Sequence, residues 1–433
     1  MLGVIILVLV LGVEVGVMIG CLKTSSYQKK LRNKVNIGLF LFLVLLVPIG
    51  IIHWSFRWYL LFLFLFLRAL VGTWYFVRKS RKNEAIFKKK YVIMLSIRSI
   101  LLLLLVAFPM MLFPQFRVIT ATGSKDVKTV SYTLTDLDRM ETYTDIGENR
   151  KITIQFWYPE STKEKYPLLI FSHGAFGFRG SNASTYEELA SNGYVVCSID
   201  HTYHSFFTKQ TDGKVVIVNT DFLSDAVAVQ NNTLDEQETY ELLQEWLKIR
   251  MADVNLTMKE ITKNVESGEA DEVYTLINLD KIGLFGHSMG GATAAKLGRE
   301  RSDIDAVIVI DGTMFGEDVG FEDGKAMITK EPYPIPILNM YNEEHYRDAL
   351  AYAESYENII ATENAVDARQ IVVNGSGHLN FTDLPMFSPA LAGLLGTGKV
   401  DSRYCIETMN RIILDYFNYY LKDAEELNLK TTY

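Results

Sequence analysis

Long apolar stretches in the first quarter of the chain constrain its fold more than any other feature. Four of them provide the ~20 residues that a helix needs to cross a bilayer, and they cover residues 1–22, 36–54, 56–77 and 91–113. Backbone groups left unpaired in lipid are too costly, so such segments must be helical. The sequence therefore predicts an all-α bundle of four transmembrane helices over residues 1–115, embedded in a lipid bilayer.

The charges around these stretches predict their orientation. Residues 1–115 hold 15 Lys and Arg side chains but only two acidic ones. The basic residues gather in two segments, 23–34 and 78–90, which the positive-inside rule assigns to the cytoplasm. After the fourth crossing, everything beyond about residue 113 then lies on the other side. We expect a multi-pass protein of the plasma membrane whose C-terminal part faces the extracytoplasmic side.

Three charged side chains fall within the apolar stretches, namely Glu14, Arg68 and Arg98. A charge in the hydrocarbon region is costly unless another group of the protein neutralises it. Glu14 and Arg68 carry opposite charges and lie on different expected helices. We therefore expect these two side chains to form an ion pair that holds the bundle together.

Residues 116–433 form a second domain of a different kind. The whole chain has a net charge of −8, and after the basic first part this domain carries −21, which is unfavourable for binding nucleic acid. Short apolar runs alternate with helical stretches, a pattern that predicts an α/β fold with a mostly parallel, doubly wound sheet. The expected strands are 129–135, 151–158, 167–172, 194–199, 281–286, 306–311, 336–341 and 369–374. The expected helices are 183–192, 234–265, 290–300, 345–356 and 403–421.

One pentapeptide of this domain, Gly286-His287-Ser288-Met289-Gly290, matches the G-x-S-x-G pattern. It directly follows the apolar run KIGLFG and directly precedes the small residues GATAA, which begin a helix. A strand, a sharp turn and a helix in this order present the nucleophile of an α/β-hydrolase. The two outer glycines are needed because side chains there would collide where strand and helix cross. The motif therefore predicts an α/β-hydrolase fold with Ser288 as the nucleophile.

A serine hydroxyl becomes a good nucleophile only when a base removes its proton. The chain order in this fold is nucleophile, acid, histidine, and only His345 and His378 follow Ser288. His378 lies in the loop after the last expected strand, where the base belongs. We interpret His345 as the start of a surface helix, and we assign the base to His378.

The acid of such a site orients the imidazole and stabilises its charged form. Asp311 closes the strand that follows the nucleophile helix. Glu343 and Glu344 close the next strand, which is the more usual position of the acid in this fold. Spacing alone leaves the choice open.

Two backbone amides must hold the negative charge that develops on the substrate oxygen. One is expected at Met289, directly after the nucleophile. The other is expected at Ala175, because His173-Gly174-Ala175 follows the strand PLLIFS and is similar to an HG-type oxyanion motif. We expect His173 to brace this loop and not to act as a second base.

No cofactor and no metal is expected. His201 and His204 lie close to Asp200, but they follow a strand end and have no obvious third ligand, so we expect them to line the mouth of the active site. The residues next to the motifs are candidates for the substrate pocket. These candidates are Phe176, His287, Leu379 and Phe381.

The motifs together resemble the platelet-activating factor acetylhydrolases, the serine-dependent lipoprotein-associated phospholipase A2 group, and their bacterial relatives. The matching segments lie within about residues 125–425. They are PLLIFSHG at 167–174, GHSMGGAT at 286–293, Asp-Gly at 311–312 and GSGHLNFTD at 375–383.

The resemblance implies an acid at the end of the strand after the nucleophile turn, and hence a triad of Ser288, Asp311 and His378. It also implies oxyanion amides at Ala175 and Met289. Bacterial cutinase-like polyester hydrolases share the GHSMGG motif but place the acid one strand later.

The resemblance implies a serine ester hydrolase that works through an acyl-enzyme, and the apolar stretches of residues 1–115, which the family's secreted members lack, predict that it is membrane-anchored. Its substrate would be a small-molecule or lipid ester, with short-chain or oxidised phospholipid esters as candidates. Two alternatives stay open: a cutinase-like hydrolase of polyesters or lipids, and a non-catalytic membrane sensor whose hydrolase fold binds a ligand.

Overall fold

The computed structural model describes residues 2–78, 86–160, 164–268, 271–363 and 365–433. Most of the second basic segment, residues 79–85, lies outside the described residues. The orientation that this segment predicts therefore rests on the sequence.

The chain divides into two compact units. Unit 1 comprises Met1–Val118 together with Met386–Leu391, and unit 2 comprises Ile119–Pro385 and Ala392–Tyr433. The apolar N-terminal stretches belong to unit 1. The strand-rich part of the sequence belongs to unit 2.

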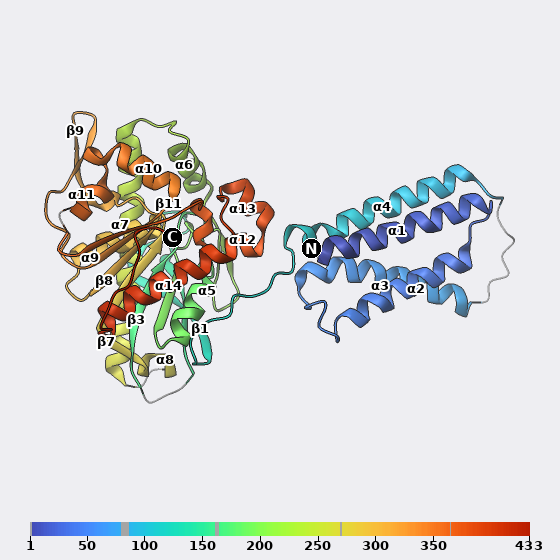
Figure 1. The fold of residues 1–433 in the computed structure, drawn as a ribbon, viewed down its shortest axis with the longest axis horizontal. Helices are drawn as coiled ribbons and strands as arrows, with labels where there is room; N and C mark the ends of the chain where they lie inside the picture. The colour runs from blue at the N-terminus through green and yellow to red at the C-terminus, as the bar shows by residue number, and fades with distance from the viewer. Residues whose placement is uncertain (1, 79–85, 161–163, 269–270, 364) are drawn as a thin grey trace. The chain divides into compact units, whose positions relative to one another are not determined.

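Unit 1 is built from helices (Figure 1). Their apolar side chains face both inward and outward. Buried leucines such as Leu43, Leu65 and Leu103 form a core between the helices. Many large apolar side chains on the outer surface are exposed, as in a bundle whose surroundings are lipid and not water. The helices are α1 (Leu2–Lys23), α2 (Lys29–Leu46), α3 (Phe56–Val77) and α4 (Lys89–Leu112).

Three of these helices, α1, α3 and α4, are long and apolar enough to cross a membrane. The expected second span over 36–54 is wrong in its extent. Helix α2 begins at Lys29 with the basic sequence KKLRNK and already ends at Leu46. Pro48 and Gly50 lie in the turn that follows, where Gly50 has a φ of 76°. The described residues therefore contain three clear candidates for spans and not four.

A buried polar cluster joins the four helices of unit 1. Glu14 on α1 is 4% exposed and pairs with Arg68 of α3 at 2.7 Å and with Arg32 of α2 at 2.9 Å. Each guanidinium also donates to a serine hydroxyl of α4. The predicted pair of Glu14 and Arg68 is confirmed, and Arg32 adds a second cation to it. Arg98 is exposed on α4.

Unit 2 is organised around an eight-stranded sheet in the order β1-β2-β4-β3-β7-β8-β11-β12. Strands β1, β2 and β4 pair antiparallel, and all neighbours from β4 to β12 pair parallel. Each strand coincides with one of the eight expected runs. The strands are β1 (Val127–Met140), β2 (Asn149–Pro159), β3 (Tyr166–Ser172), β4 (Val195–Asp200), β7 (Ile277–His287), β8 (Ala306–Ile310), β11 (Ile337–Asn342) and β12 (Ala368–Val373).

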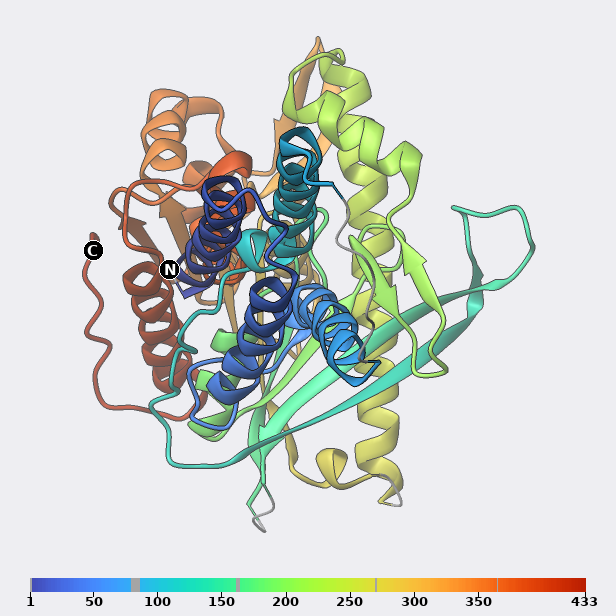
Figure 2. The same cartoon turned by 90° about the vertical axis from the view of Figure 1, so that its right-hand side faces the viewer.

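Helices cover both faces of this sheet, with α5 and α14 on one face and α7 and α9 on the other (Figures 1 and 2). The parallel strands β3, β4, β8 and β11 are buried because they consist largely of apolar residues such as Ile, Val and Leu. The expected α/β architecture with a mostly parallel sheet is confirmed. The helices that matter below are α5 (Ala183–Ser191), α6 (Thr220–Gln230), α7 (Glu236–Ser267), α9 (Met289–Glu300), α10 (Glu343–Ala351) and α14 (Ser402–Leu421).

The parallel arrangement brings the loops after β3, β7, β8, β11 and β12 to the same edge of the sheet. In open α/β sheets, ligands bind at this carboxyl edge. All of the proposed catalytic groups come from these five loops.

Candidate active site

The sharp turn between β7 and α9 carries Ser288. Its φ of 56° and ψ of −126° are strained for a residue with a side chain, and its N–H donates to Ile310 O at 2.8 Å. A Cβ on Gly290 would lie 1.9 Å from Ser172 O, and one on Gly286 would lie 2.2 Å from the Gly290 carbonyl carbon. The expected strand, turn and helix, and the need for both glycines, are confirmed.

Asp311 and His378 meet at the carboxyl edge of the sheet. Asp311 follows β8, His378 follows β12, and the His378 Nδ1 donates to Asp311 Oδ2 at 2.7 Å. The direction of this bond follows because an ionised carboxylate can only accept. Asp311 is 3% exposed, whereas 43% of the His378 side chain is exposed. The carboxylate is thus buried, and the imidazole that it holds reaches the surface.

The Asp311 carboxylate accepts four hydrogen bonds. Oδ1 accepts from the backbone N–H of Asn342 at 2.8 Å and from His345 Nδ1 at 2.9 Å. Oδ2 accepts from Asn342 Nδ2 at 2.6 Å as well as from His378. Burial alone would raise the pKa of Asp311, but the two imidazole donors outweigh it and hold this pKa well below its usual range. The carboxylate is therefore ionised at neutral pH.

His345 contacts Asp311, which the sequence does not predict. It was expected on a surface helix, and it does lie in the first turn of α10, but only 18% of its side chain is exposed. Its Nε2 contacts the hydroxyl of Tyr356, which also lies 3.0 Å from Thr313 Oγ1. One signal was available: His345 follows β11, which pairs with β8, the strand that ends before Asp311.

Glu343 and Glu344, the alternative acids, have other partners. Both are exposed in the first turn of α10. Glu343 Oε2 accepts from the backbone N–H of Gly375 at 2.7 Å, and Glu344 pairs with Arg347 at 3.3 Å. Neither contacts a histidine within the described residues. The strand end itself holds Asn342, whose neutral amide donates to the aspartate.

The backbone amides of Ala175 and Met289 are both free to bind a ligand. Neither N–H donates a hydrogen bond to any of the described residues. Met289 is the first residue of α9, where an amide has no acceptor within its own helix. The loop with Ala175 lies close to the nucleophile, because a Cβ on Gly174 would come within 3.0 Å of the Ser288 Cβ. The two amides can therefore hold an oxyanion formed beside Ser288.

His287, a pocket candidate, packs against His378. The centroids of the two rings lie 4.5 Å apart, and His287 Nε2 donates to His378 O at 3.0 Å. Burial and the neighbouring His378 lower the pKa of His287 to about 3, so its ring is neutral. In the described residues, the hydrogen bonds of His378 join it to Asp311 and His287, and none reaches Ser288. Bonds between nucleophile and base often tighten only when substrate binds.

The other pocket candidates divide into two groups. Phe176 and Leu379 are half-buried, and Phe176 packs against Phe222 of α6 at 5.5 Å within an apolar cluster that also includes Met289. Phe381 is fully buried and cannot form an open wall of a pocket. Its backbone is fixed inside the fold, because its carbonyl accepts from an asparagine side chain at 2.6 Å.

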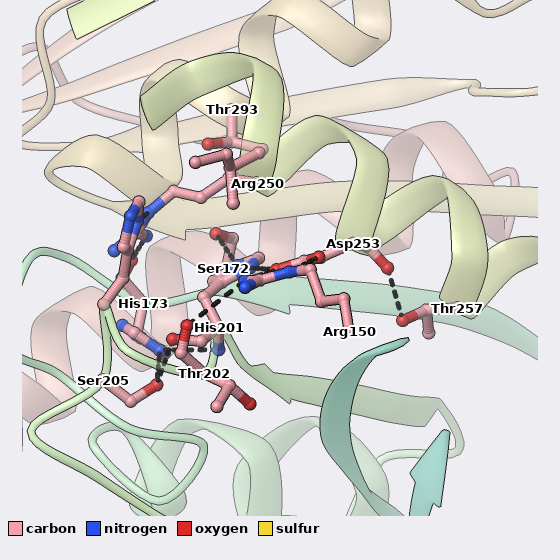
Figure 3. A network of polar contacts seen from close by, with 12 residues as sticks. Arg150, Ser172, His173, His201, Thr202, Ser205, Arg250, Asp253, Thr257 and Thr293 are labelled. Atoms are coloured by element: carbon pink, nitrogen blue, oxygen red, sulfur yellow. Dashed lines mark hydrogen bonds and ion pairs between the residues drawn. The ribbon is translucent and has the colours of Figure 1, made fainter. Parts of the chain in front are cut away.

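Asp200, His201 and His204 do not line the mouth of the site, contrary to expectation, because all three are fully buried. Asp200 pairs with Arg179. The two histidines belong to a buried polar network, in which Figure 3 labels His201. In the described part of the chain, no three His, Cys, Asp or Glu side chains are grouped to hold a metal ion.

Comparison with known proteins identifies the family that this chain matches. The sequence model of the family described as platelet-activating factor acetylhydrolase, isoform II, matches residues 149–430. The platelet-activating factor acetylhydrolase of Cavia porcellus is 27% identical over 291 residues, which cover 63% of this chain and 61% of that protein. The one from Bos taurus is 27% identical over 281 residues, which cover 60% and 58%. The chain thus spans about three fifths of the length of these curated relatives.

A solved structure shares the fold. The ferulic acid esterase from Streptomyces cinnamoneus aligns with a TM-score of 0.54 and 19% identity, over 72% of this chain and 96% of that one. The family match covers well over half of the chain and contains every candidate residue of the site. The chain therefore belongs to the platelet-activating factor acetylhydrolase isoform II family of α/β-hydrolases.

Proposed function

We propose that this protein is a serine carboxylic ester hydrolase with Ser288, His378 and Asp311 as its triad. One observation carries the proposal. A strained serine, a hydrogen-bonded pair of aspartate and histidine, and two free backbone amides lie at one edge of the sheet. Membership of a family of acetylhydrolases supports the same activity.

The reaction proceeds through an acyl-enzyme. Ser288 Oγ attacks the ester carbonyl while His378 Nε2 takes the hydroxyl proton. The amides of Ala175 and Met289 hold the resulting oxyanion. When the tetrahedral intermediate collapses, the bond to the leaving oxygen breaks and His378 returns the proton to the alkoxide. Water, activated by His378, then hydrolyses the acyl-serine and releases the acid.

Asp311 keeps His378 in the tautomer that these reaction steps need. Its carboxylate holds the proton on Nδ1, so that Nε2 is free to accept the proton of Ser288. Its negative charge then stabilises the imidazolium. The bonds from Asn342 and His345 fix the position of the carboxylate and keep it ionised.

We also propose that the substrates are phospholipid esters with a short or oxidised acyl chain. The relatives are named platelet-activating factor acetylhydrolases, and the apolar helices of unit 1 suit a protein that works beside lipid. The apolar cluster next to the amides of Ala175 and Met289 offers contacts to a short acyl chain.

Hydrolysis by the purified full-length chain in detergent micelles tests both proposals. We expect the kcat/KM for a phosphatidylcholine with an acetyl group at sn-2 to exceed that for the dipalmitoyl lipid by at least about 10-fold, because a pocket distinguishes acyl chains by their methylenes. Protein treated with a fluorophosphonate is the control and should be inactive. Hydrolysis of polyesters alone would contradict the substrate class, and inactivity towards every ester would contradict the enzyme.

We propose further that α2 also crosses the membrane, which makes residues 1–115 a four-helix membrane region and residues 116–433 an extracytoplasmic hydrolase domain. Its leucines Leu39 and Leu43 share the core of unit 1 with the spanning helices. If α2 stayed on one side, the basic segments 23–34 and 78–90 would face opposite compartments, against the positive-inside rule.

Protease added to intact cells tests the sidedness. We expect it to remove the hydrolase domain and to leave a protected fragment that contains unit 1 helices. A cytoplasmic marker protein should stay intact in the same sample, and it should be digested once the cells are permeabilised. Full protection of the hydrolase domain in intact cells would contradict the orientation.

A further inference from the structure

A fully buried guanidinium contacts the loop that carries Ala175. Arg250 of α7 donates from its two terminal nitrogens to the carbonyl oxygens of His173 and Gly174, the second at 3.3 Å. Its Nε donates to His204 Nδ1 at 3.2 Å. Each nitrogen of the guanidinium thus has a partner, and none of these partners is a carboxylate. Figure 3 shows Arg250 extending towards His173.

The histidines around Arg250 do not compensate its charge. Burial, followed by the positive charge of Arg250, lowers the pKa values of His173 and His204 well below the usual range. Burial also lowers the pKa of His201 to about 4. All three rings are therefore neutral at physiological pH. Burial lowers the pKa of Arg250 itself only to about 9, so this side chain remains a cation.

A second buried arginine in the same network makes the contrast clear. Arg150 pairs with Asp253 at 2.7 Å and with Glu141 at 3.0 Å, and so its charge is neutralised by contact. Asp253 also accepts from Arg139 and His201. Asp253 therefore forms its ion pairs with other side chains, and it attracts Arg250 only through space. An unpaired buried charge is expensive for folding, so a functional reason for Arg250 is worth seeking.

The position of Arg250 supplies such a reason. The Gly174 carbonyl and the Ala175 N–H belong to one peptide group, in which electrons are delocalised. The Gly174 oxygen accepts from Arg250 and, at 2.6 Å, from His173 Nδ1. Donors at the oxygen draw electron density from the nitrogen, and such chains of hydrogen bonds strengthen one another in a buried site. The Ala175 N–H is thereby a stronger donor.

We propose that Arg250 is a positioning residue of the oxyanion site, which orients and polarises the Gly174–Ala175 peptide so that its amide stabilises the tetrahedral intermediate. The inference rests on the proposed ester hydrolysis. Because the oxyanion exists only after Ser288 has attacked, the contribution falls on the transition state and not on substrate binding. Loss of Arg250 must then lower kcat and leave KM nearly unchanged.

Steady-state kinetics of the full-length Arg250→Gln variant test this inference. We expect kcat to fall about 10²-fold with KM within about 2-fold, and the affinity for a trifluoromethyl ketone analogue of the intermediate to fall in parallel. Arg299→Gln is the matched control, because the terminal nitrogens of Arg299 also donate to backbone carbonyls. Arg299 lies at the far end of α9, however, and Glu317 neutralises its charge. This control should lower the thermal midpoint and leave kcat unchanged.

If Arg250→Gln does not fold, the same inference is tested with Arg250→Ala. This variant is assayed with and without millimolar ethylguanidinium. We expect the added cation to restore kcat at least about 5-fold in this variant and to have no effect on the Arg299→Gln control. A folded Arg250→Gln variant with the kcat and analogue affinity of the wild type overturns the inference, and so does failure of the cation to restore kcat. Full activity of Ser288→Ala would instead overturn the proposed ester hydrolysis, so the two failures are distinguishable.

Discussion

Ser288→Ala is expected to lower the kcat for a nitrophenyl ester by at least about 10³-fold while KM changes little. The variant removes only the attacking oxygen. The Cβ stays, so the strained turn and the amides of Ala175 and Met289 keep their places. The remaining activity would come from binding and from the oxyanion site alone. Initial rates of the full-length chain in micelles measure the effect, and the thermal midpoint of the variant shows that it is folded.

Ser191→Ala is the control for this experiment. Ser191 is also buried, but its hydroxyl donates to Glu188 O in α5, away from the carboxyl edge of the sheet. The Ser191→Ala variant should retain the wild-type kcat and react with a fluorophosphonate probe, whereas Ser288→Ala should not react. If Ser288→Ala hydrolyses the ester as fast as the wild type, another nucleophile is at work. If the wild-type chain neither hydrolyses esters nor takes up the probe, the non-catalytic sensor becomes the better hypothesis.

The strands of the sheet could be predicted from the sequence because each is defined by residues that are close together in the chain. Each strand contains a run of β-branched, aromatic or other apolar residues close together in the chain, and such a run is visible without any knowledge of its neighbours. The two hairpins, β5 (Phe207–Lys209) with β6 (Val215–Ile217) and β9 (Asp318–Glu322) with β10 (Lys325–Ile328), were missed. Their strands are short, and most of their residues are exposed or only half-buried, so they lack such a run.

The membrane region shows the limit of the same argument. The length of the apolar stretches predicted the positions of α1, α3 and α4 correctly. It misplaced the second helix, because hydropathy cannot reveal that the cations of KKLRNK are already helical or that the helix ends before Pro48. The pairing of Glu14 with Arg68 could be foreseen, since both charges lie inside apolar stretches. Arg32 lies outside those stretches, and only its tertiary contact reveals its role.

The candidate site was predictable where short motifs define it and not where distant segments meet. Ser288 and the loop of Ala175 each lie in a recognisable motif after a strand. His345 meets Asp311 across 34 positions of the chain, and Arg250 meets His173 across 77. No local pattern marks Arg250, and the place of His345 after β11 becomes informative only once the pairing of β11 with β8 is known.

Asp311→Asn is expected to lower kcat/KM by about 10³ to 10⁴-fold. The amide nitrogen of asparagine donates and cannot accept, so it would face the Nδ1–H of His378 and force this proton onto Nε2. His378 could then no longer take the proton of Ser288. Two of the four donors that now surround the carboxylate would also lose their acceptor, because the amide keeps only one oxygen. Kinetics with the nitrophenyl ester measure the loss.

The same variant should change how stability depends on pH. The folded-state pKa of Asp311 lies well below its usual value, so the ionised carboxylate stabilises the fold above the unfolded-state pKa. This stabilisation is lost as the pH falls through the folded-state pKa. We therefore expect the thermal midpoint of Asp311→Asn to lie below that of the wild type at neutral pH, and the difference to shrink in acid.

Glu343→Gln and Glu344→Gln complete the comparison and decide between the two possible positions of the acid. Both glutamates are exposed and have partners outside the histidine pair, so each variant should keep kcat/KM within about 2-fold of the wild type. If one of them instead loses activity by orders of magnitude while Asp311→Asn remains active, the acid lies one strand later, as in the cutinase-like enzymes. The buried position of Asp311 and its four donors argue for the first result, because a carboxylate held in this way has a fixed geometry, whereas an exposed glutamate on a helix surface can rotate away from His378.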